Sequence, residues 1–319
     1  KARGLNVDKG NNINLNYETN FFDCTISVAV IHHISSEERR IQAIRELIRV
    51  VLNYIQTVKV FFLRLFGFID FAVPPNSNMR RTSAKNIKHY IYSGISTYLP
   101  IATAAKFHGV KFDKNTNILD FGCGVAGQLR PFVKHFPDAA FHACDVDPSS
   151  IEFINKNYPK VKAYANLFEP PLTFSDNQMD LVYSVSTFSH FDKETIDLWL
   201  KEFSRVIKPG GLLLLTIEGE YALNVVASET NEDPHEIREV LQKEGIFYKN
   251  YSWLNKLQQR GPALTKSVDI SSYFGEAYGN TIINRDFVDK NFNKYDFSVL
   301  GISEGVICER QDLIVLQHK

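Results

Sequence analysis

The stretch N-I-L-D-F-G-C-G-V-A-G, residues 117–127, decides the fold of this 319-residue chain. Ile118 and Leu119 are typical of the end of a buried strand, and residues 128–135 predict the start of a helix. Between them the glycines at 122, 124 and 127 form the pattern G-x-G-x-x-G. Glycines here allow a tight turn and let a ligand approach the main chain and the helix N-terminus. The stretch therefore predicts a ligand-binding loop between a strand and a helix.

Two carboxylates accompany this loop. Residues 141–146 predict a second strand, and its Asp145 stands 21 residues after Gly124. A carboxylate at that distance is placed to bind ribose hydroxyls at the tip of the neighbouring strand. Asp120 stands two residues before the first glycine, and its negative charge suits a cationic sulfonium ligand with an amino group better than a pyrophosphate. The pair favours S-adenosylmethionine over a dinucleotide.

Downstream motifs extend the pattern and resemble a known family. A strand over 179–186 opens with M-D-L-V-Y-S, and a helix from about Lys193 ends in I-K-P-G-G at 207–211, which leads into a strand over 212–217. In this order the motifs over about 117–219 resemble the class I S-adenosylmethionine-dependent methyltransferases. The resemblance implies an α/β fold, a Rossmann-like seven-stranded mixed sheet with helices on both faces. It also implies a methyltransferase enzyme with S-adenosyl-L-methionine as its cofactor.

Position at the strand ends then selects candidate cofactor-binding residues. These are Asp120, Phe121, Gly122, Cys123, Gly124, Asp145, Val146, Asn166, Leu167 and Ser184. Asn166 and Leu167 follow the third strand and are placed to meet the adenine, although Asn166 could instead cap the next turn. Cys123 is more typical of a small packing residue than of a nucleophile.

The catalytic candidate is His190, in the loop after the fourth strand. A lone histidine is more often a packed or capping residue than a base. Methyl transfer from a sulfonium depends mainly on in-line alignment, and a general base is required only if the accepting atom must first lose a proton. The aromatic residues Tyr98, Tyr273, Phe274 and Tyr278 are candidates for the acceptor pocket, or else ordinary core residues.

Beyond the motifs, the pattern predicts further elements. Residues 79–109 are expected to be helical, 222–244 to form a polar helical excursion, and 284–292 a helix. Segments 297–302 and 312–317 predict a closing hairpin.

Composition limits the partners. Lys plus Arg and Asp plus Glu number 36 each, so no net field favours nucleic acid or a membrane surface. The four cysteines have no C-x-x-C spacing, which indicates a reducing, cytoplasmic setting and no metal site.

The N-terminal residues 1–73 predict an extension before the methyltransferase domain of 74–319, with Pro74-Pro75 at the boundary. Within it, Phe22 to Val50 repeats the later strand and helix, for example His33 with His190 at an offset of 157 residues. This partial strand-helix repeat resembles part of the eukaryotic tRNA wobble-uridine (carboxymethyluridine) methyltransferases. Because it lacks a glycine loop, a fusion remnant or a mis-joined gene model is its expected origin.

Residues 50–73 are the most apolar stretch of the chain. Lys59, Arg64 and Asp70 interrupt it, so no transmembrane span is expected. A long amphipathic helix on a partner is one interpretation, and an interfacial membrane helix is the other.

The sequence thus predicts a methyltransferase of unknown acceptor, with a small molecule or glycan favoured. One alternative is tRNA wobble-uridine methylation, which would require nucleic acid as partner. The other is a non-catalytic methyltransferase-like module that binds a partner. That module would be expected to have a damaged cofactor loop, whereas Asp120, Gly122, Gly124 and Asp145 are all present.

Overall fold

The computed structural model describes residues 71–75, 78–79, 86–250 and 278–319. The chain divides into two compact units, residues 1–76 and residues 77–319. The repeat at 22–50, most of the apolar stretch 50–73, Tyr273 and Phe274 lie outside the described residues.

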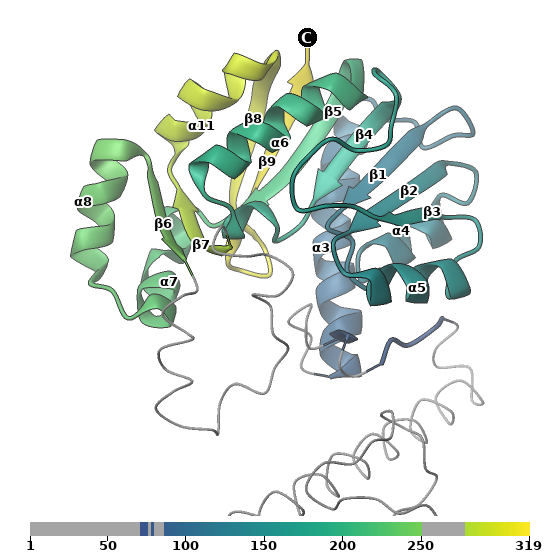
Figure 1. The fold of residues 1–319 in the computed structure, drawn as a ribbon, viewed down its shortest axis with the longest axis horizontal. Coiled ribbons are helices and arrows are strands. Elements are labelled where there is room, and N and C mark those ends of the chain that lie inside the picture. Colours follow the sequence, from purple (N-terminus) through teal and green to yellow (C-terminus); the bar gives the residue numbers. More distant parts are fainter. Residues whose placement is uncertain (1–70, 76–77, 80–85, 251–277) are drawn as a thin grey trace, which may run out of the picture. The chain divides into compact units, whose positions relative to one another are not determined.

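A seven-stranded sheet forms the centre of the described part of residues 77–319 (Figure 1). Its strands are β1 (Asn117–Phe121), β2 (Ala140–Asp145), β3 (Lys162–Ala165), β4 (Met179–Ser184), β5 (Ile207–Ile217), β8 (Phe297–Ile307) and β9 (Gln311–His318). They lie in the order β3-β2-β1-β4-β5-β9-β8, parallel from β3 to β5 and antiparallel at β9 and β8. The predicted Rossmann-like mixed sheet and its closing hairpin are confirmed.

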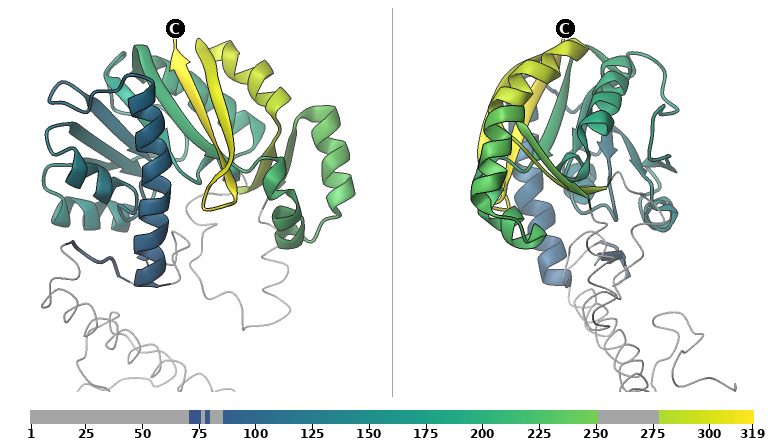
Figure 2. Two further views of the ribbon diagram at one scale, coloured as in Figure 1. Left: turned by 180° about the vertical axis from the view of Figure 1, so that it is seen from behind. Right: turned by 60° about the vertical axis from the view of Figure 1, so that its left-hand side comes forward.

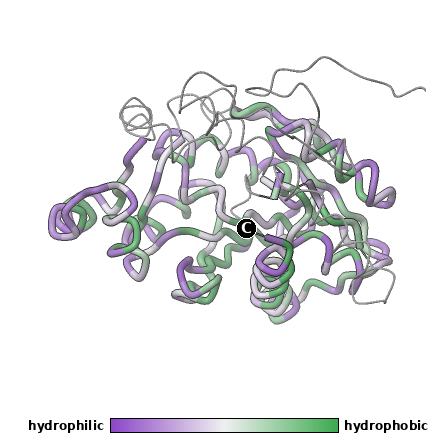
Figure 3. The backbone as a smooth tube through the Cα atoms, turned by 90° about the horizontal axis from the view of Figure 1, so that it is seen from below, coloured by the Kyte–Doolittle hydropathy of each residue, from purple (hydrophilic) through white to green (hydrophobic). Residues whose placement is uncertain are grey.

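Helices cover both faces of this sheet, as predicted. Helices α3 (Ile87–Phe107), α4 (Leu129–His135) and α5 (Pro148–Asn157) share one hydrophobic cluster with it. Helices α6 (Lys193–Val206) and α11 (Arg285–Asn291) share the other cluster, and Figure 2 shows α3 on the face opposite to them. Figure 3 shows hydrophobic residues through the middle of the sheet and hydrophilic ones at many outer turns, as burial of apolar side chains requires.

Capping residues explain where the helices begin. Asn86 accepts a hydrogen bond from the amide of His89, so α3 starts at Ile87. Earlier in the segment predicted to be helical, Met79 is helical, and residues 80–85 lie outside the described residues.

Among the described residues, no helix is long and apolar enough to span a membrane.

The excursion after β5 is helical, as predicted for residues 222–244. It forms two helices, α7 (Leu223–Thr230) and α8 (Pro234–Glu244), because Asn231 is left-handed with a φ of 56° and ends the first. Asp233 then caps the second, and Pro234 occupies its first turn.

Two further strands, β6 (Ile246–Asn250) and β7 (Gly279–Ile283), pair antiparallel and were not predicted as strands. Together with α7 and α8 they form what we call the inserted unit, at the left of the sheet in Figure 1. Its own small core includes Val226, Ile237, Leu241 and Ile282.

Candidate functional site

The glycine loop lies where β1 ends, next to the point at which the strand order reverses between β1 and β4. Ligands of open α/β sheets bind at such a switch point, outside the carboxyl ends of the strands. Gly122 and Gly124 have φ values of 73° and 48°, a left-handed backbone that favours glycine. At Gly127 no such backbone is required.

Neighbouring elements hold this loop from two sides. The amides of Gly122 and Cys123 both donate to the carbonyl of Cys144 in β2, at 2.9 and 3.1 Å. From α3, the hydroxyl of Tyr90 donates to the carbonyl of Val125 at 2.8 Å. The loop therefore has a defined shape before any ligand arrives.

Asp145 lies directly beside the loop, as the spacing predicted. Its Oδ2 accepts a hydrogen bond from the amide of Gly124 at 2.8 Å, and its Oδ1 accepts one from the amide of Asp147 at 2.9 Å. An ionised carboxylate is an acceptor-only group, so its side chain is of a kind that suits ligand hydroxyls.

Asp120 is buried in β1, and its Oδ2 has no hydrogen-bond partner among the described residues. Burial raises the pKa of its carboxyl to about 8; the Tyr183 hydroxyl opposes this rise and the charge of Asp145 adds to it. The acid is therefore largely protonated at neutral pH in the ligand-free protein. A cation bound against it would favour the carboxylate form.

The ends of β3 and β4 contribute two more buried oxygen atoms that lack partners in the described part of the chain. These are Asn166 Oδ1 and Ser184 Oγ. Asn166 also donates through Nδ2 to the carbonyl of Leu167 at 2.6 Å, and the Leu167 side chain is 80% exposed. Buried polar atoms normally have partners, so the carboxyl ends of β3 and β4 fit a ligand rich in polar groups.

The other predicted cofactor residues lie at or beneath the loop. Phe121 is buried against Trp199 and Phe203, with ring centroids 4.4 and 5.1 Å apart. Burial raises the pKa of the Cys123 thiol, which keeps it neutral and supports its interpretation as a packing residue. Val146 is half-buried directly after Asp145.

His190 lies in a short 3-10 helix, η2 (Phe188–His190), after β4. Its Nδ1 is 2.8 Å from the carbonyl oxygen of Gly279, and its ring stacks on Tyr278 with centroids 4.6 Å apart. Burial lowers the pKa of His190 to about 4. The structure thus joins two predicted residues, His190 and Tyr278, at the inserted unit.

Tyr98 is not brought to the loop. Its ring packs between α3 and α4 against Phe132 and His135, at 4.7 and 5.2 Å, in the hydrophobic core. Tyr90, two turns earlier in α3, is the tyrosine that reaches the loop. Both lie on the inward face of the same helix, so spacing alone could not distinguish them.

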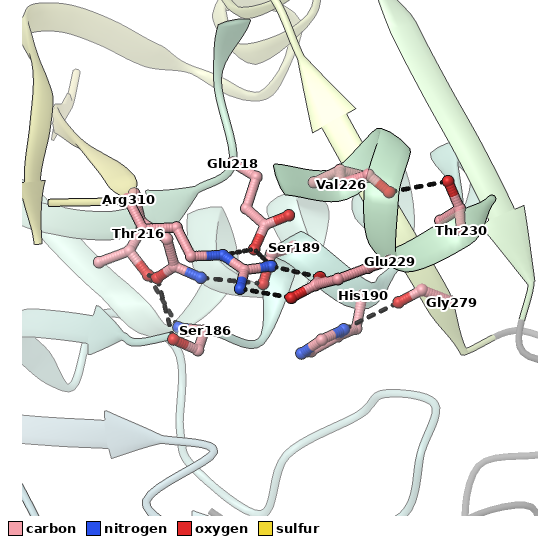
Figure 4. A network of polar contacts seen from close by, with 11 residues as sticks. Ser186, Ser189, His190, Thr216, Glu218, Val226, Glu229, Thr230, Gly279 and Arg310 are labelled. Carbon is pink, nitrogen blue, oxygen red and sulfur yellow. Dashed lines mark hydrogen bonds and ion pairs between the residues drawn. The ribbon is translucent and has the colours of Figure 1, made fainter. Parts of the chain in front are cut away.

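A polar network at the ends of β5 and β9 was missed by sequence reasoning (Figure 4). Gln311 Oε1 accepts hydrogen bonds from the hydroxyls of Ser186 and Thr216, at 2.9 and 2.8 Å. Arg310 donates to buried Glu218 at 2.6 Å and to Glu229 at 2.7 Å. Burial raises the pKa of Glu218 to about 7, against the opposing charge of Arg310. The one signal for this network in the sequence was the presence of polar Thr216 and Glu218 at the end of an apolar strand.

Comparison with known proteins agrees with this geometry. Residues 118–211 match the family model described as a methyltransferase domain. This range holds the loop, both carboxylates and β4.

Three curated relatives are methyltransferases by name. The chain is 28% identical over 116 residues to the human tRNA N(3)-cytidine methyltransferase METTL6, which is 34% of this chain and 41% of that protein. It is 28% identical over 126 residues to a demethylmenaquinone methyltransferase from Chlorobaculum parvum, 39% of this chain and 51% of the relative. It is 44% identical over 52 residues to a probable tRNA methyltransferase 9B from Bos taurus, 16% and 12% of the two chains. The chain therefore spans about half, or less, of the relatives it matches.

Proposed function

Because residues 118–211 match the methyltransferase domain family, we propose that the chain binds S-adenosyl-L-methionine and transfers its methyl group to an acceptor. A small molecule or glycan is the favoured acceptor. The observation that carries the proposal is the hydrogen bond from Gly124 to Asp145, which joins the loop to the acidic end of β2. Buried oxygens of Asp120, Asn166 and Ser184 at the same edge, which have no hydrogen-bond partner within the described ranges, support it.

Each residue then has a physical role. The cofactor supplies an electrophilic methyl group on a sulfonium. Asp120 offers a negative charge to its cationic amino acid part, and Asp145 accepts hydrogen bonds from the ribose hydroxyls. Leu167 offers an exposed apolar side chain to the adenine. Orientation of the two reactants supplies most of the rate enhancement, since effective molarities can reach roughly 10⁵ M or more.

Binding of S-adenosylhomocysteine is the first test. A ligand that binds only the native state at a hundredfold excess over Kd stabilises it by about 2.7 kcal/mol, so the melting temperature should rise. Asp145→Ala should reduce this shift, because loss of charged hydrogen bonds costs roughly 1.5–3 kcal/mol. Asp138→Ala, at an exposed aspartate in the turn before β2, is the matched control and should leave the shift unchanged. A melt that responds to NADH and not to S-adenosylhomocysteine would remove the cofactor assignment.

Residues 74–319 are proposed to be sufficient for cofactor binding. The loop, both carboxylates and the sheet all lie within residues 77–319, which form one compact unit. A protein starting at Pro74 is expected to bind S-adenosylhomocysteine with the Kd of the full chain, measured by calorimetric titration. Loss of binding in a shortened protein that keeps its circular dichroism spectrum would assign the first 73 residues to the site.

A tRNA is the second candidate acceptor. The identity to the bovine and human tRNA methyltransferases favours it, although each match covers a minor part of those proteins. Transfer of a labelled methyl group to pooled tRNA, compared with pooled metabolites and glycans, separates the two candidates. Failure to bind the cofactor would instead support the non-catalytic, partner-binding module.

The cytoplasm is the proposed location. Cys123, Cys144 and Cys308 are not disulfide-bonded in the described part of the chain, which supports a reducing compartment.

A further inference from the structure

The inserted unit is attached to the catalytic sheet at several points. Arg310, in the β8–β9 turn, binds both Glu218 after β5 and Glu229 of α7 (Figure 4). At β7, the amide of Ile283 donates to the carbonyl of Glu218 at 3.0 Å. A further set of attachments involves the loop that follows β4, residues 185–191, which we call the β4 loop.

Three contacts join β7 and its leading residue to the β4 loop. Tyr278 and Phe191 form an antiparallel bridge, and the hydroxyl of Thr281 donates to the carbonyl of Phe191 at 2.6 Å. His190 Nδ1 lies 2.8 Å from the carbonyl of Gly279 (Figure 4). In the other two contacts the β4 loop contributes the backbone of Phe191, whereas in this one it contributes the side chain of His190.

The bond to Gly279 determines which ring nitrogen of His190 carries a hydrogen. A carbonyl oxygen only accepts hydrogen bonds, so Nδ1 must carry the hydrogen. Burial lowers the pKa of His190 to about 4, the bond to Gly279 opposes that effect, and the charges of Arg310 and Glu229 act in opposite directions. The ring is therefore neutral at physiological pH, with its Nδ1 hydrogen committed to β7.

The opposite end of the β4 loop meets the glycine loop. A Cβ built at Gly122 would stand within van der Waals overlap of the Thr187 hydroxyl, which shows how closely the two loops approach. The amide of His190 donates to the carbonyl of Thr187 at 3.0 Å, which closes the 3-10 turn between them. A continuous set of contacts thus runs from Gly279 through His190 and Thr187 to Gly122.

We propose that His190 is a positioning residue that fixes the inserted unit to the β4 loop and thereby supports the glycine loop through Thr187. This role goes beyond the proposed function. Of the measurements that test it, only the binding of S-adenosylhomocysteine depends on the proposed cofactor.

Nitrogen-15 NMR of the full chain with labelled histidine tests the ring directly. His190 should show a neutral ring with hydrogen on Nδ1, and its signals should not titrate between pH 5.5 and 8. A midpoint near the usual histidine pKa, or hydrogen on Nε2, would overturn the assignment.

Hydrogen exchange of His190→Ala and His190→Asn tests the attachment. The alanine variant should exchange at least about tenfold faster at residues 185–191 and 279–283 in the ligand-free protein, since it loses the bond to Gly279. It should also bind S-adenosylhomocysteine more weakly. Asparagine offers an amide N–H in place of Nδ1–H and should restore both properties. His235→Ala, an exposed histidine of α8, is the matched control and should change neither.

The experiments distinguish a failure of the proposed role of His190 from a failure of the proposed function. Unchanged exchange in His190→Ala would contradict the attachment even if the cofactor binds. Absence of cofactor binding in the unaltered chain would contradict the proposed function, while the exchange comparison would still decide the role of His190. Equal losses in the alanine and asparagine variants would also contradict the proposal.

Discussion

Asp120→Asn is expected to raise the stability of the ligand-free protein and to weaken its binding of S-adenosylmethionine. The folded-state pKa of Asp120, about 8, lies above its unfolded value of 3.8 because the side chain is buried. Stability from this group is therefore fully present below the unfolded pKa and is lost as the pH rises toward 8. At pH 7 the loss is at most ~4 kcal/mol, since one pKa unit corresponds to about 1.4 kcal/mol. Asparagine has a similar shape and does not ionise, so the melting temperature should increase by several degrees.

The same substitution should remove a pH dependence of binding. A cationic ligand favours the ionised acid, so the unaltered protein should bind S-adenosylmethionine up to about tenfold more tightly for each unit of pH between 6 and 7.5. In Asp120→Asn the affinity should be lower and nearly flat over this range. Calorimetric titration at several pH values measures both proteins. Parallel slopes for the two would show that Asp120 does not face the ligand's positive charge.

Gly124→Val is expected to lose cofactor affinity far more than it loses stability. Its φ of 48° is left-handed, which costs an L-residue roughly 1–2 kcal/mol and a β-branched one more. Gly124 is buried, but it lies in the loop after β1 and not in a strand or helix, so the fold should survive with a lower melting temperature. Its amide is the donor to Asp145, and a shifted backbone breaks that bond. We expect affinity for S-adenosylhomocysteine to fall about 100-fold, equivalent to roughly 3 kcal/mol.

Gly127→Ala is the matched control within the same motif. Gly127 does not have a left-handed φ, and an added Cβ would stand at an ordinary 3.7 Å from the Tyr90 ring. Its melting temperature and its affinity should stay close to those of the unaltered protein. Unaltered affinity in Gly124→Val would place the ligand elsewhere, and equal losses in both variants would indicate general damage to the loop.

Much of the fold and part of the site followed from local patterns. The individual strands, α6 and the closing hairpin could be predicted from local patterns of apolar residues, whereas the seven-stranded mixed sheet was implied by the resemblance to the methyltransferases. Asp145 could be placed beside Gly124 because a strand-turn-helix unit sets the distance between successive parallel strands. The excursion was predicted to be helical but was not divided into its two helices, although Asn231, Asp233 and Pro234 are ordinary stop and start residues for helices.

By itself, the sequence determined the glycine loop, the spacing of the two carboxylates and the individual strands, because each depends on residues close together along the chain. Only the tertiary structure decided that Tyr90 rather than Tyr98 reaches the loop, and that His190 bonds to Gly279. It alone brought Arg310 to Glu218. These contacts join distant segments whose approach depends on how helices pack and where the inserted unit folds back. Long-range packing of this kind leaves no periodic signal along the chain, since each partner is selected by shape and by the need of buried polar groups for hydrogen bonds.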